Sequence, residues 1–367
     1  MVDKQNFPQV NFTQDWFEIS NFNYLPAKPV VSVVMLAYQH ASYLENAIDG
    51  VVMQKVNFPI ELVIAEDCSP DETRNIAVRY QKLHPELIRI ITADENVGMQ
   101  ANLLRALVAC RGEFIAFCEG DDYWIDSDKL TKQINVLNKN PSVNLSFHST
   151  YLRNFDSEEL TGPHYEVRGA DQIITVEEVI SGDGHYMPSA SLLIRKSALD
   201  RVPIGMLESA PIGDYILQVY GSLGGGAYYL NTPMCVYRRG HSESWSVSIN
   251  NSGKIILFEN AFAKLINLMN DDLKFYESSF IELIYRHYYP RFMNASVSGD
   301  KLLKTTFFSI LLMYINDFNM VQKVIINLSR ISFLAFIISK YPGVNRRVKK
   351  IQRFFAKYST NKISFSK

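Results

Sequence analysis

Short apolar runs alternate with stretches of helical periodicity along the first third of the chain. The apolar runs are Val30–Leu36, Ile60–Ala65, Ile88–Thr92 and Glu113–Cys118. They are too short for typical helices and rich in branched aliphatic residues, which is typical of strands buried on both faces. Between them, apolar residues recur at helical spacing, as in Ala101–Ala109. This alternation predicts βαβ units, and therefore an α/β fold with a mostly parallel, Rossmann-like sheet and flanking helices.

Three segments carry the capping-box pattern, a serine or threonine followed three residues later by glutamate: Ser42–Glu45, Ser69–Glu72 and Thr175–Glu178. Such pairs satisfy backbone N–H groups at the start of a helix, so we expect a capped helix at each. Further along, Ser189–Arg195 is predicted to be a strand, and an apolar, helical run begins near Asp214.

Acidic residues follow two of the predicted strands, where ligands bind in open α/β sheets. The second strand ends in Glu66-Asp67, ahead of a helix start that explains Asp71 and Glu72 electrostatically. Asp67 lies before that helix start, where its carboxylate can accept a hydrogen bond from a base N–H or a ribose hydroxyl. Position alone leaves this role and a simple helix-capping role equally open.

The fourth predicted strand continues into Glu119-Gly-Asp-Asp-Tyr-Trp124. Adjacent carboxylates such as Asp121 and Asp122 are costly after a buried strand unless they are solvated, paired or bound to metal. Mg²⁺ and Mn²⁺ bind one or two carboxylates and complete their shells with phosphates. The alternative is a solvated turn at Gly120. The placement after a strand of an α/β sheet favours a metal site.

The amino-acid composition excludes some classes of protein. The chain has 367 residues, 47% hydrophobic and 20% charged, with a net charge of -1, which is typical of a globular protein and argues against a nucleic-acid partner. Four scattered cysteines without a CxxC pair suggest a reduced, cytoplasmic chain. We expect no signal peptide, because the first residues lack an apolar core, and no membrane-spanning helix.

The C-terminal part has a different pattern. From about Lys254 it is predicted to be helical, and residues 340–367 carry nine Lys/Arg and no acid. Apolar helices followed by a basic tail favour a peripheral position at an anionic membrane surface, here the inner face of the cell membrane. A helical cap with a frayed basic end is nearly as good an explanation, and RNA binding is a weaker one. The expected domains are an N-terminal extension (1–29), a catalytic domain (30–250) and a helical region with its tail (251–367).

Several of these segments together resemble family 2 glycosyltransferases of the GT-A fold, of the bacterial surface-polysaccharide type. They are AYQHASYLENAIDGVVMQ, EDCSPDET, NVGMQANLLRALVACRGEFIAFCEGDDYW and DKLTKQINVL. The likeness covers about residues 30–245. It implies an inverting enzyme that uses a nucleotide-sugar donor and holds a divalent cation, Mn²⁺ or Mg²⁺, through a DxD-type motif.

The resemblance also implies roles for particular residues. Asp122 matches the more direct metal ligand, and Asp121 faces the ribose or the metal. The remaining nucleotide-binding positions are Ala37 and Tyr38 in the loop that packs on the base, Asp67, Asn102 and Arg239. Glu66 and Cys68 depart from the family, which more usually has aspartate and glycine at these positions.

Three further residues lie toward the end of the catalytic region. From its position alone Asp214 is better explained as a first-turn acid of a helix, but the resemblance makes it the catalytic base. In Tyr237-Arg-Arg-Gly-His241, either Arg238 or Arg239 is expected to neutralise the diphosphate, and His241 to join the metal. From the residues alone this segment is equally a solvated basic loop.

The expected function is transfer of a hexose or N-acetylhexosamine from a nucleotide-diphosphate donor, with UDP the favoured nucleotide. The acceptor is a hydroxyl of a glycan or lipid-linked glycan in polysaccharide synthesis. One alternative is a catalytically inactive nucleotide-sugar or glycan-binding module. Another is a sugar-phosphate nucleotidyltransferase, which should have a glycine-rich phosphate loop after the first strand; AYQHASY contains no glycine.

Overall fold

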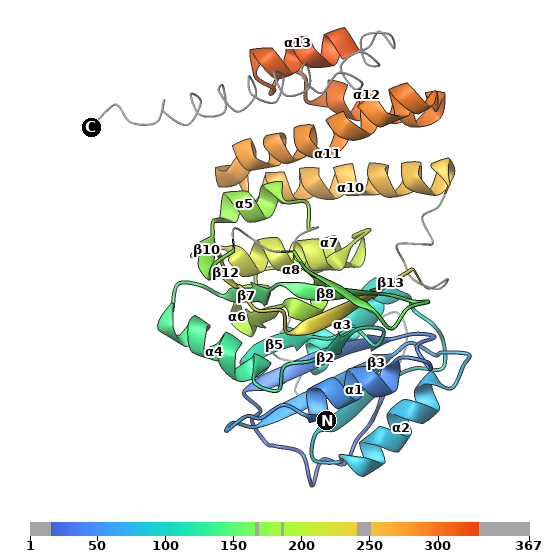
Figure 1. Cartoon of the computed structure of the whole chain (residues 1–367), viewed down its shortest axis with the longest axis vertical. Helices are drawn as coiled ribbons and strands as arrows, with labels where there is room; N and C mark the ends of the chain where they lie inside the picture. The colour runs from blue at the N-terminus through green and yellow to red at the C-terminus, as the bar shows by residue number, and fades with distance from the viewer. Residues whose placement is uncertain (1–15, 166–168, 185–186, 241–250, 330–367) are drawn as a thin grey trace. The chain divides into compact units, whose positions relative to one another are not determined.

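The protein is described here from a computed structural model that covers residues 16–165, 169–184, 187–240 and 251–329. The chain divides into two compact units, Met1–Ile249 and Asn250–Lys367, which are described separately below (Figure 1).

The N-terminal unit is built on one large sheet. Within the described residues the order is β1-β4-β3-β2-β5-β11-β7-β12-β10, and six of these nine strands run in one direction. The strands are β1 (Phe17–Ile19), β2 (Val31–Ala37), β3 (Ile60–Glu66), β4 (Ile88–Thr92), β5 (Phe114–Phe117), β7 (Leu145–His148), β10 (Gln172–Ile174), β11 (Leu193–Arg195) and β12 (Ala227–Leu230). The expected mostly parallel α/β sheet is confirmed, and each of the four predicted strands lies within a residue of its place.

Helices cover this sheet in the way that βαβ units require (Figure 1). They are α1 (Leu44–Val52), α2 (Thr73–Leu83), α3 (Met99–Ala109), α4 (Lys129–Lys139), α5 (Val176–Ser181), α6 (Lys196–Leu199), α7 (Ile204–Glu208) and α8 (Gly213–Ser222). The predicted strand at Ser189–Arg195 is only half right, because Ser189–Ser191 forms a 3₁₀ turn and β11 begins at Leu193.

A second, smaller sheet was not predicted. Its order is β6-β13-β8-β9, with β6 (Tyr123–Trp124), β8 (Thr150–Asn154), β9 (Leu160–His164) and β13 (Cys235–Arg239). β6 follows β5 by only a few residues and pairs with β13, which is more than a hundred residues further along the chain. This pairing fixes the position of the residues between β5 and β6.

Only one of the three expected capping boxes forms. Thr175 and Glu178 make both reciprocal hydrogen bonds at the start of α5. Neither α1 nor α2 has a side-chain cap: Glu45 pairs with Arg79 instead, and α2 begins after Ser69–Glu72. At α2 the Ser69 hydroxyl instead accepts from the backbone N–H of Gln39 (3.2 Å), so a tertiary contact replaces the local pattern.

At the outer edge of the large sheet, β1 pairs with β4 and closes a buried ion network. Arg89 on β4 is fully buried and lies between Glu18 of β1 (2.7 Å) and Glu61 of β3 (3.0 Å). A buried arginine without such partners would cost several kcal/mol, so β1 is an integral part of this sheet.

The C-terminal unit is helical, as expected, with α10 (Ser252–Asp272), α11 (Glu277–Ser298), α12 (Lys301–Met313) and α13 (Met320–Ser329). α10 and α11 are joined by a buried group in which Glu259 contacts His287 (2.8 Å) and Arg291 (3.0 Å). Among the described residues, no helix has both the length and the apolar character needed to cross a membrane.

Candidate active site

The acid turn, residues 119–122, connects β5 to β6 at the carboxyl edge of the large sheet. Two backbone hydrogen bonds shape it, from Gly120 N to Leu36 O (2.9 Å) and from Asp122 N to Glu119 O (3.0 Å). A Cβ atom at Gly120 would lie 2.7 Å from Nδ1 of His40 and 3.1 Å from the Leu36 carbonyl. The glycine is therefore needed because the turn lies directly against the end of β2.

Asp122 is completely buried, and its two carboxylate oxygens have different surroundings. Oδ1 accepts a hydrogen bond from the backbone N–H of Arg238 (2.9 Å). Oδ2 has no hydrogen-bond partner within the described part of the chain. Burial raises the pKa of Asp122 well above its ordinary value, and the nearby charges of Asp121 and Glu119 raise it further. A bound cation would stabilise the charged form of this carboxylate, and Oδ2 is the oxygen that could bind it.

Glu119 is a site residue that the sequence analysis did not single out. Its Oε2 accepts from the Ser189 hydroxyl (2.9 Å), and burial raises the pKa of its carboxyl to about 8, with Asp121 and Asp214 adding to the rise. The charge of Asp214 is thus felt at the acid turn, although the two are some ninety residues apart in sequence. The sequence did hold a signal for Glu119: it is a third acid at the same strand end, two positions before Asp121.

Asp214 lies in the first turn of α8, half-buried, and its Oδ1 accepts from the N–H of Tyr215 (2.9 Å). The preceding residue, Gly213, lies close to α3. A Cβ atom there would lie 2.6 Å from Oε1 of Gln100. The glycine therefore lets the start of α8 come close to α3, and Asp214 is near enough to the acid turn for its charge to act on Glu119.

The Asp67 carboxylate is 2% exposed and accepts three hydrogen bonds. Two come from the backbone N–H groups of Val97 and Gly98 (both 2.9 Å), and the third from Nη2 of Arg105 (2.8 Å). Nε and Nη1 of Arg105 have no partner within the described residues. Asp67 thus organises the loop that leads into α3, with a buried arginine beside it.

Asn102 is also inside this network rather than on its surface. Its side-chain amide donates to the Ala65 carbonyl (2.7 Å) and accepts from Arg105 (3.2 Å). It therefore connects α3 to β3 next to Asp67.

The loop after β2 has the exposure expected of a base-binding surface. Ala37 is buried at the strand end, and its carbonyl accepts from the N–H of Asp67 (3.0 Å), whereas Tyr38 is 41% exposed. Nearby, Cys68 adopts φ +55°, the left-handed conformation that favours glycine. This conformation suits the glycine that the family resemblance leads us to expect at that position.

The two arginines of β13 differ in their surroundings. Arg238 is 5% exposed and its Nη1 donates to the Asp121 carbonyl (2.8 Å). Arg239 is exposed, and its Nε donates to Asn154 Oδ1 (3.1 Å). The arginine that contacts the acid turn is therefore Arg238, and the diphosphate contact of Arg239 stays a prediction. His241, the third predicted metal ligand, lies outside the described residues.

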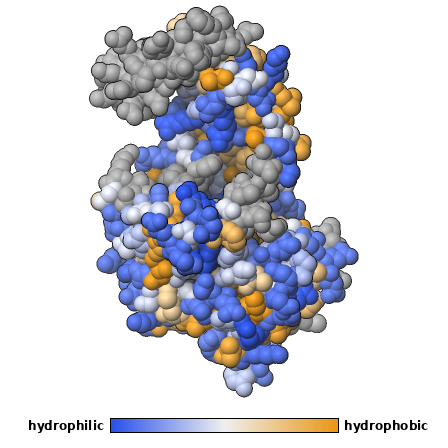
Figure 2. Space-filling view, turned by 45° about the vertical axis from the view of Figure 1, so that its right-hand side comes forward, coloured by the Kyte–Doolittle hydropathy of each residue, from blue (hydrophilic) through white to orange (hydrophobic). Residues whose placement is uncertain are grey.

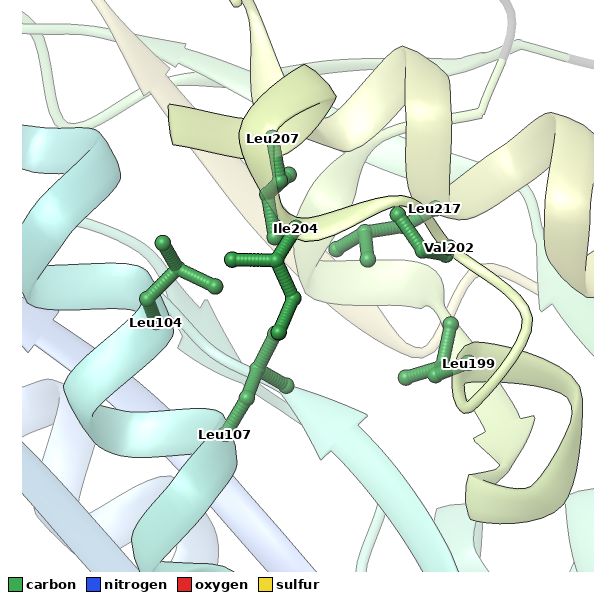
Figure 3. A pocket seen from close by; sticks show the side chains of 7 residues that line it. All are labelled: Leu104, Leu107, Leu199, Val202, Ile204, Leu207 and Leu217. Carbon is green, nitrogen blue, oxygen red and sulfur yellow. The ribbon is translucent and has the colours of Figure 1, made fainter. Parts of the chain in front are cut away.

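An apolar pocket between α3 and the segment from α6 to α8 is separate from these polar groups (Figure 3). All seven lining side chains are aliphatic: Leu104, Leu107, Leu199, Val202, Ile204, Leu207 and Leu217. The enclosed space of about 10 Å³ fits roughly one water molecule. It is a packing gap in the core and not a binding site for a sugar or nucleotide.

Comparison with known proteins agrees with this geometry. Residues 32–201 match the model of the glycosyl transferase family 2. The segment contains β2 to β5, the acid turn and β11, so residues 32–201 are a family 2 glycosyltransferase domain with the GT-A fold.

The chain spans less than two thirds of the length of the curated relatives that it matches. An uncharacterized protein of Mycobacterium tuberculosis is 32% identical over 216 residues, which is 59% of this chain and 60% of that protein. A putative teichuronic acid biosynthesis glycosyltransferase, TuaG of Bacillus subtilis, is 36% identical over 110 residues, 30% of this chain and 42% of that protein. The crystal structure of Staphylococcus aureus TarS 1–349 in complex with UDP-GlcNAc superposes with a TM-score of 0.62 at 17% identity, covering 88% of this chain and 91% of that one. The last likeness shows the shared fold.

Proposed function

We propose that the protein transfers a sugar from a UDP-sugar donor to a hydroxyl of a glycan or lipid-linked glycan in polysaccharide synthesis, with inversion at the anomeric carbon. The observation that carries the proposal is the convergence of Asp121, Asp122, Glu119 and Asp214 at the carboxyl edge of a family 2 GT-A sheet. The UDP-GlcNAc bound to TarS and the teichuronic acid pathway named for TuaG support the choice of donor and product class.

A divalent cation is implied by the family, and the acid turn fits one. In the part of the chain that the structure describes, the fully buried Oδ2 of Asp122 has no hydrogen-bond partner, and Asp121 precedes it in the same turn. Among the described residues, no three His, Cys, Asp or Glu side chains converge closely enough to hold a metal ion by themselves. Mg²⁺ and Mn²⁺ typically take one or two carboxylates from the protein and complete their shells with phosphate and water. Asp122 and Asp121 would hold the cation together with the donor diphosphate, and we propose that His241 joins them.

In the proposed reaction, the exposed Tyr38 packs on the base, and the loop organised by Asp67 and Asn102 encloses it. Asp214 accepts the proton of the acceptor hydroxyl as that oxygen bonds to the anomeric carbon. The bond from the anomeric carbon to the diphosphate breaks in the same step, so the nucleoside diphosphate leaves from the opposite face. A bound divalent cation would supply neutralisation of the charge on that leaving group.

A panel of nucleotide sugars tests the proposal. With Mn²⁺ present, we expect the purified protein to release the nucleoside diphosphate slowly from one UDP-sugar, and faster once a suitable acceptor glycan is added. Release is measured by a coupled assay for UDP or GDP, with chelator-treated protein as the control. Binding of a nucleotide sugar without release or transfer to any acceptor would favour the inactive binding module instead.

We also propose that the C-terminal unit places the enzyme at an anionic membrane surface. The nine Lys/Arg of residues 340–367 support this, as does the number of exposed apolar side chains on the helices before them. These include Leu257, Phe275, Leu302, Met313 and Met320, each at least 60% exposed. In Figure 2 apolar side chains are visible on this unit among hydrophilic ones. Such a mixture is typical of interfacial helices.

Removing residues 340–367 tests the membrane proposal. Each Lys or Arg near an anionic surface contributes about 1 kcal/mol, so several together give reversible binding. We expect the full-length protein to pellet with anionic vesicles, less so at high salt, and the shortened protein to pellet much less. Neutral vesicles are the control. Equal pelleting of the two proteins with anionic vesicles would make the tail irrelevant to membrane binding.

A further inference from the structure

Arg238 lies next to the acid turn and makes several hydrogen bonds there. It is 5% exposed, and its Nη1 donates to the Asp121 carbonyl (2.8 Å). Its Nη2 donates to Oδ1 of Asn46 on α1 (2.9 Å), and its backbone N–H donates to Oδ1 of Asp122 (2.9 Å). One residue of β13 therefore connects the acid turn, α1 and the small sheet.

The guanidinium is also held between two aromatic rings. Its carbon lies 4.4 Å from the ring centre of Tyr123 and 5.3 Å from that of Tyr43. A cation over an aromatic face is attracted by the ring, and a planar guanidinium does so while keeping its N–H donors in fixed directions. Lysine would keep the charge, but its ammonium group cannot combine this stacking with two fixed donor directions.

These contacts act on a turn that is electrostatically unfavourable. Glu119, Asp121 and Asp122 place three carboxyl groups within a four-residue segment, and like charges so close together repel one another. The positively charged Arg238 opposes that repulsion, because its backbone N–H and its Nη1 both donate to residues of the turn. Its hydrogen bonds fix the Asp121 backbone and one Asp122 oxygen, which leaves Oδ2 of Asp122 available.

We infer that Arg238 is a positioning residue that holds the acid turn in its cation-binding shape. Nη1 donates to the turn itself and Nη2 donates to α1, and the rings of Tyr43 and Tyr123 hold the guanidinium in place. The inference rests on the proposed function, because it assumes that a divalent cation binds at Asp121 and Asp122.

The test compares Arg238→Lys with its matched neighbour Arg239→Lys. Binding of Mn²⁺ alone is measured by electron paramagnetic resonance, and binding of UDP with Mn²⁺ by calorimetry. Positioning partners of metal sites typically change metal affinity by about 10–100-fold when they are replaced. We therefore expect Arg238→Lys to weaken Mn²⁺ binding at least about tenfold, both without and with UDP, whereas Arg239→Lys leaves Mn²⁺ binding alone unchanged.

A second variant tests the same contact in case Arg238→Lys does not fold. Asn46 is exposed, so Asn46→Ala removes the acceptor of Nη2 without opening the core. We expect a smaller loss of Mn²⁺ affinity, up to about fivefold, which corresponds to one hydrogen bond. Melting temperatures of all variants are recorded, so that a loss of metal affinity in a folded variant is separable from unfolding.

The outcomes separate the positioning role of Arg238 from the proposed function. Wild-type affinity for Mn²⁺ alone in both Arg238→Lys and Asn46→Ala would overturn the positioning role. A variant that loses UDP binding but keeps affinity for Mn²⁺ alone would make Arg238 a diphosphate ligand, which also overturns it. Failure of the wild-type protein to bind Mn²⁺ with any nucleoside diphosphate would refute the proposed function itself.

Discussion

Asp214→Asn is expected to lower the rate of sugar transfer by at least about two orders of magnitude while nucleotide binding stays nearly normal. A positioned general base contributes roughly 10²–10⁴-fold to rate, and asparagine has almost the same shape but cannot take up the proton. The carboxylate of Asp214 can accept the proton as the acceptor oxygen begins to bond to the anomeric carbon.

The measurement is kcat for transfer beside the dissociation constant for UDP with Mn²⁺. A base that acts only in the transition state changes kcat and kcat/KM together and leaves ground-state binding unchanged. Glu208→Gln, an exposed carboxylate at the end of the neighbouring α7, is the matched control and should behave as wild type. Near-normal transfer by Asp214→Asn would assign the base elsewhere, with Asp183 or His185 the next candidates, of which His185 lies outside the described residues. Lost nucleotide binding would make Asp214 a donor-site residue.

Asp122→Asn is expected to weaken metal-dependent binding of UDP by about 100-fold or more, equivalent to roughly 2.7 kcal/mol. Asparagine retains an oxygen that can accept from the Arg238 N–H, so the turn can keep its shape. What is lost is the negative charge on the partnerless, buried Oδ2, which a hard cation prefers to a neutral amide. Calorimetry with UDP, with and without chelator, measures the effect.

The same substitution should stabilise the metal-free protein. The folded pKa of Asp122 is raised above its unfolded value, so the folded state binds more protons and loses stability as the pH rises above about 4. Asparagine carries no charge at any of these pH values. The metal-free variant should therefore melt at a higher temperature than wild type at pH 8, and the difference should shrink toward pH 4.

An exposed neighbouring acid serves as the control for Asp122. Asp128 lies at the start of α4 and makes no side-chain cap, so Asp128→Asn should change neither UDP binding nor the pH dependence of melting. UDP affinity that is the same with and without metal in the wild-type protein would refute a cation site at the acid turn.

The large sheet was predictable because its central strands have a strong signal. β2 to β5 are buried on both faces, and such strands appear in sequence as unbroken apolar runs. The small sheet lacks this signal: β6 has two residues, and β9 is exposed along its whole length. Its strands are defined by partners far along the chain, which local periodicity cannot reveal.

In the candidate site, too, some features could be predicted from the sequence and others could not. Asp121 and Asp122 were predicted from their place at a strand end, whereas Asp214 was predicted only from the family resemblance. The contacts that hold the acids could not be predicted, since Arg238 reaches Asp122 across 116 positions and Arg105 reaches Asp67 across 38. The two failed capping boxes have a similar cause, because Glu45 pairs with Arg79 on α2 and Ser69 accepts from the N–H of Gln39.

The pairing of β1 with β4 has a practical consequence for anyone shortening this protein for expression. A version trimmed to begin at residue 30, where the apolar pattern starts, would lack Glu18 and leave the guanidinium of Arg89 with one of its two carboxylate partners. It would also open the hydrogen-bonding edge of β4, whose five residues are all buried, to pairing with other molecules. A useful truncation boundary therefore lies before Phe17, and affinity tags at this end should leave Phe17–Ile19 free to join the sheet.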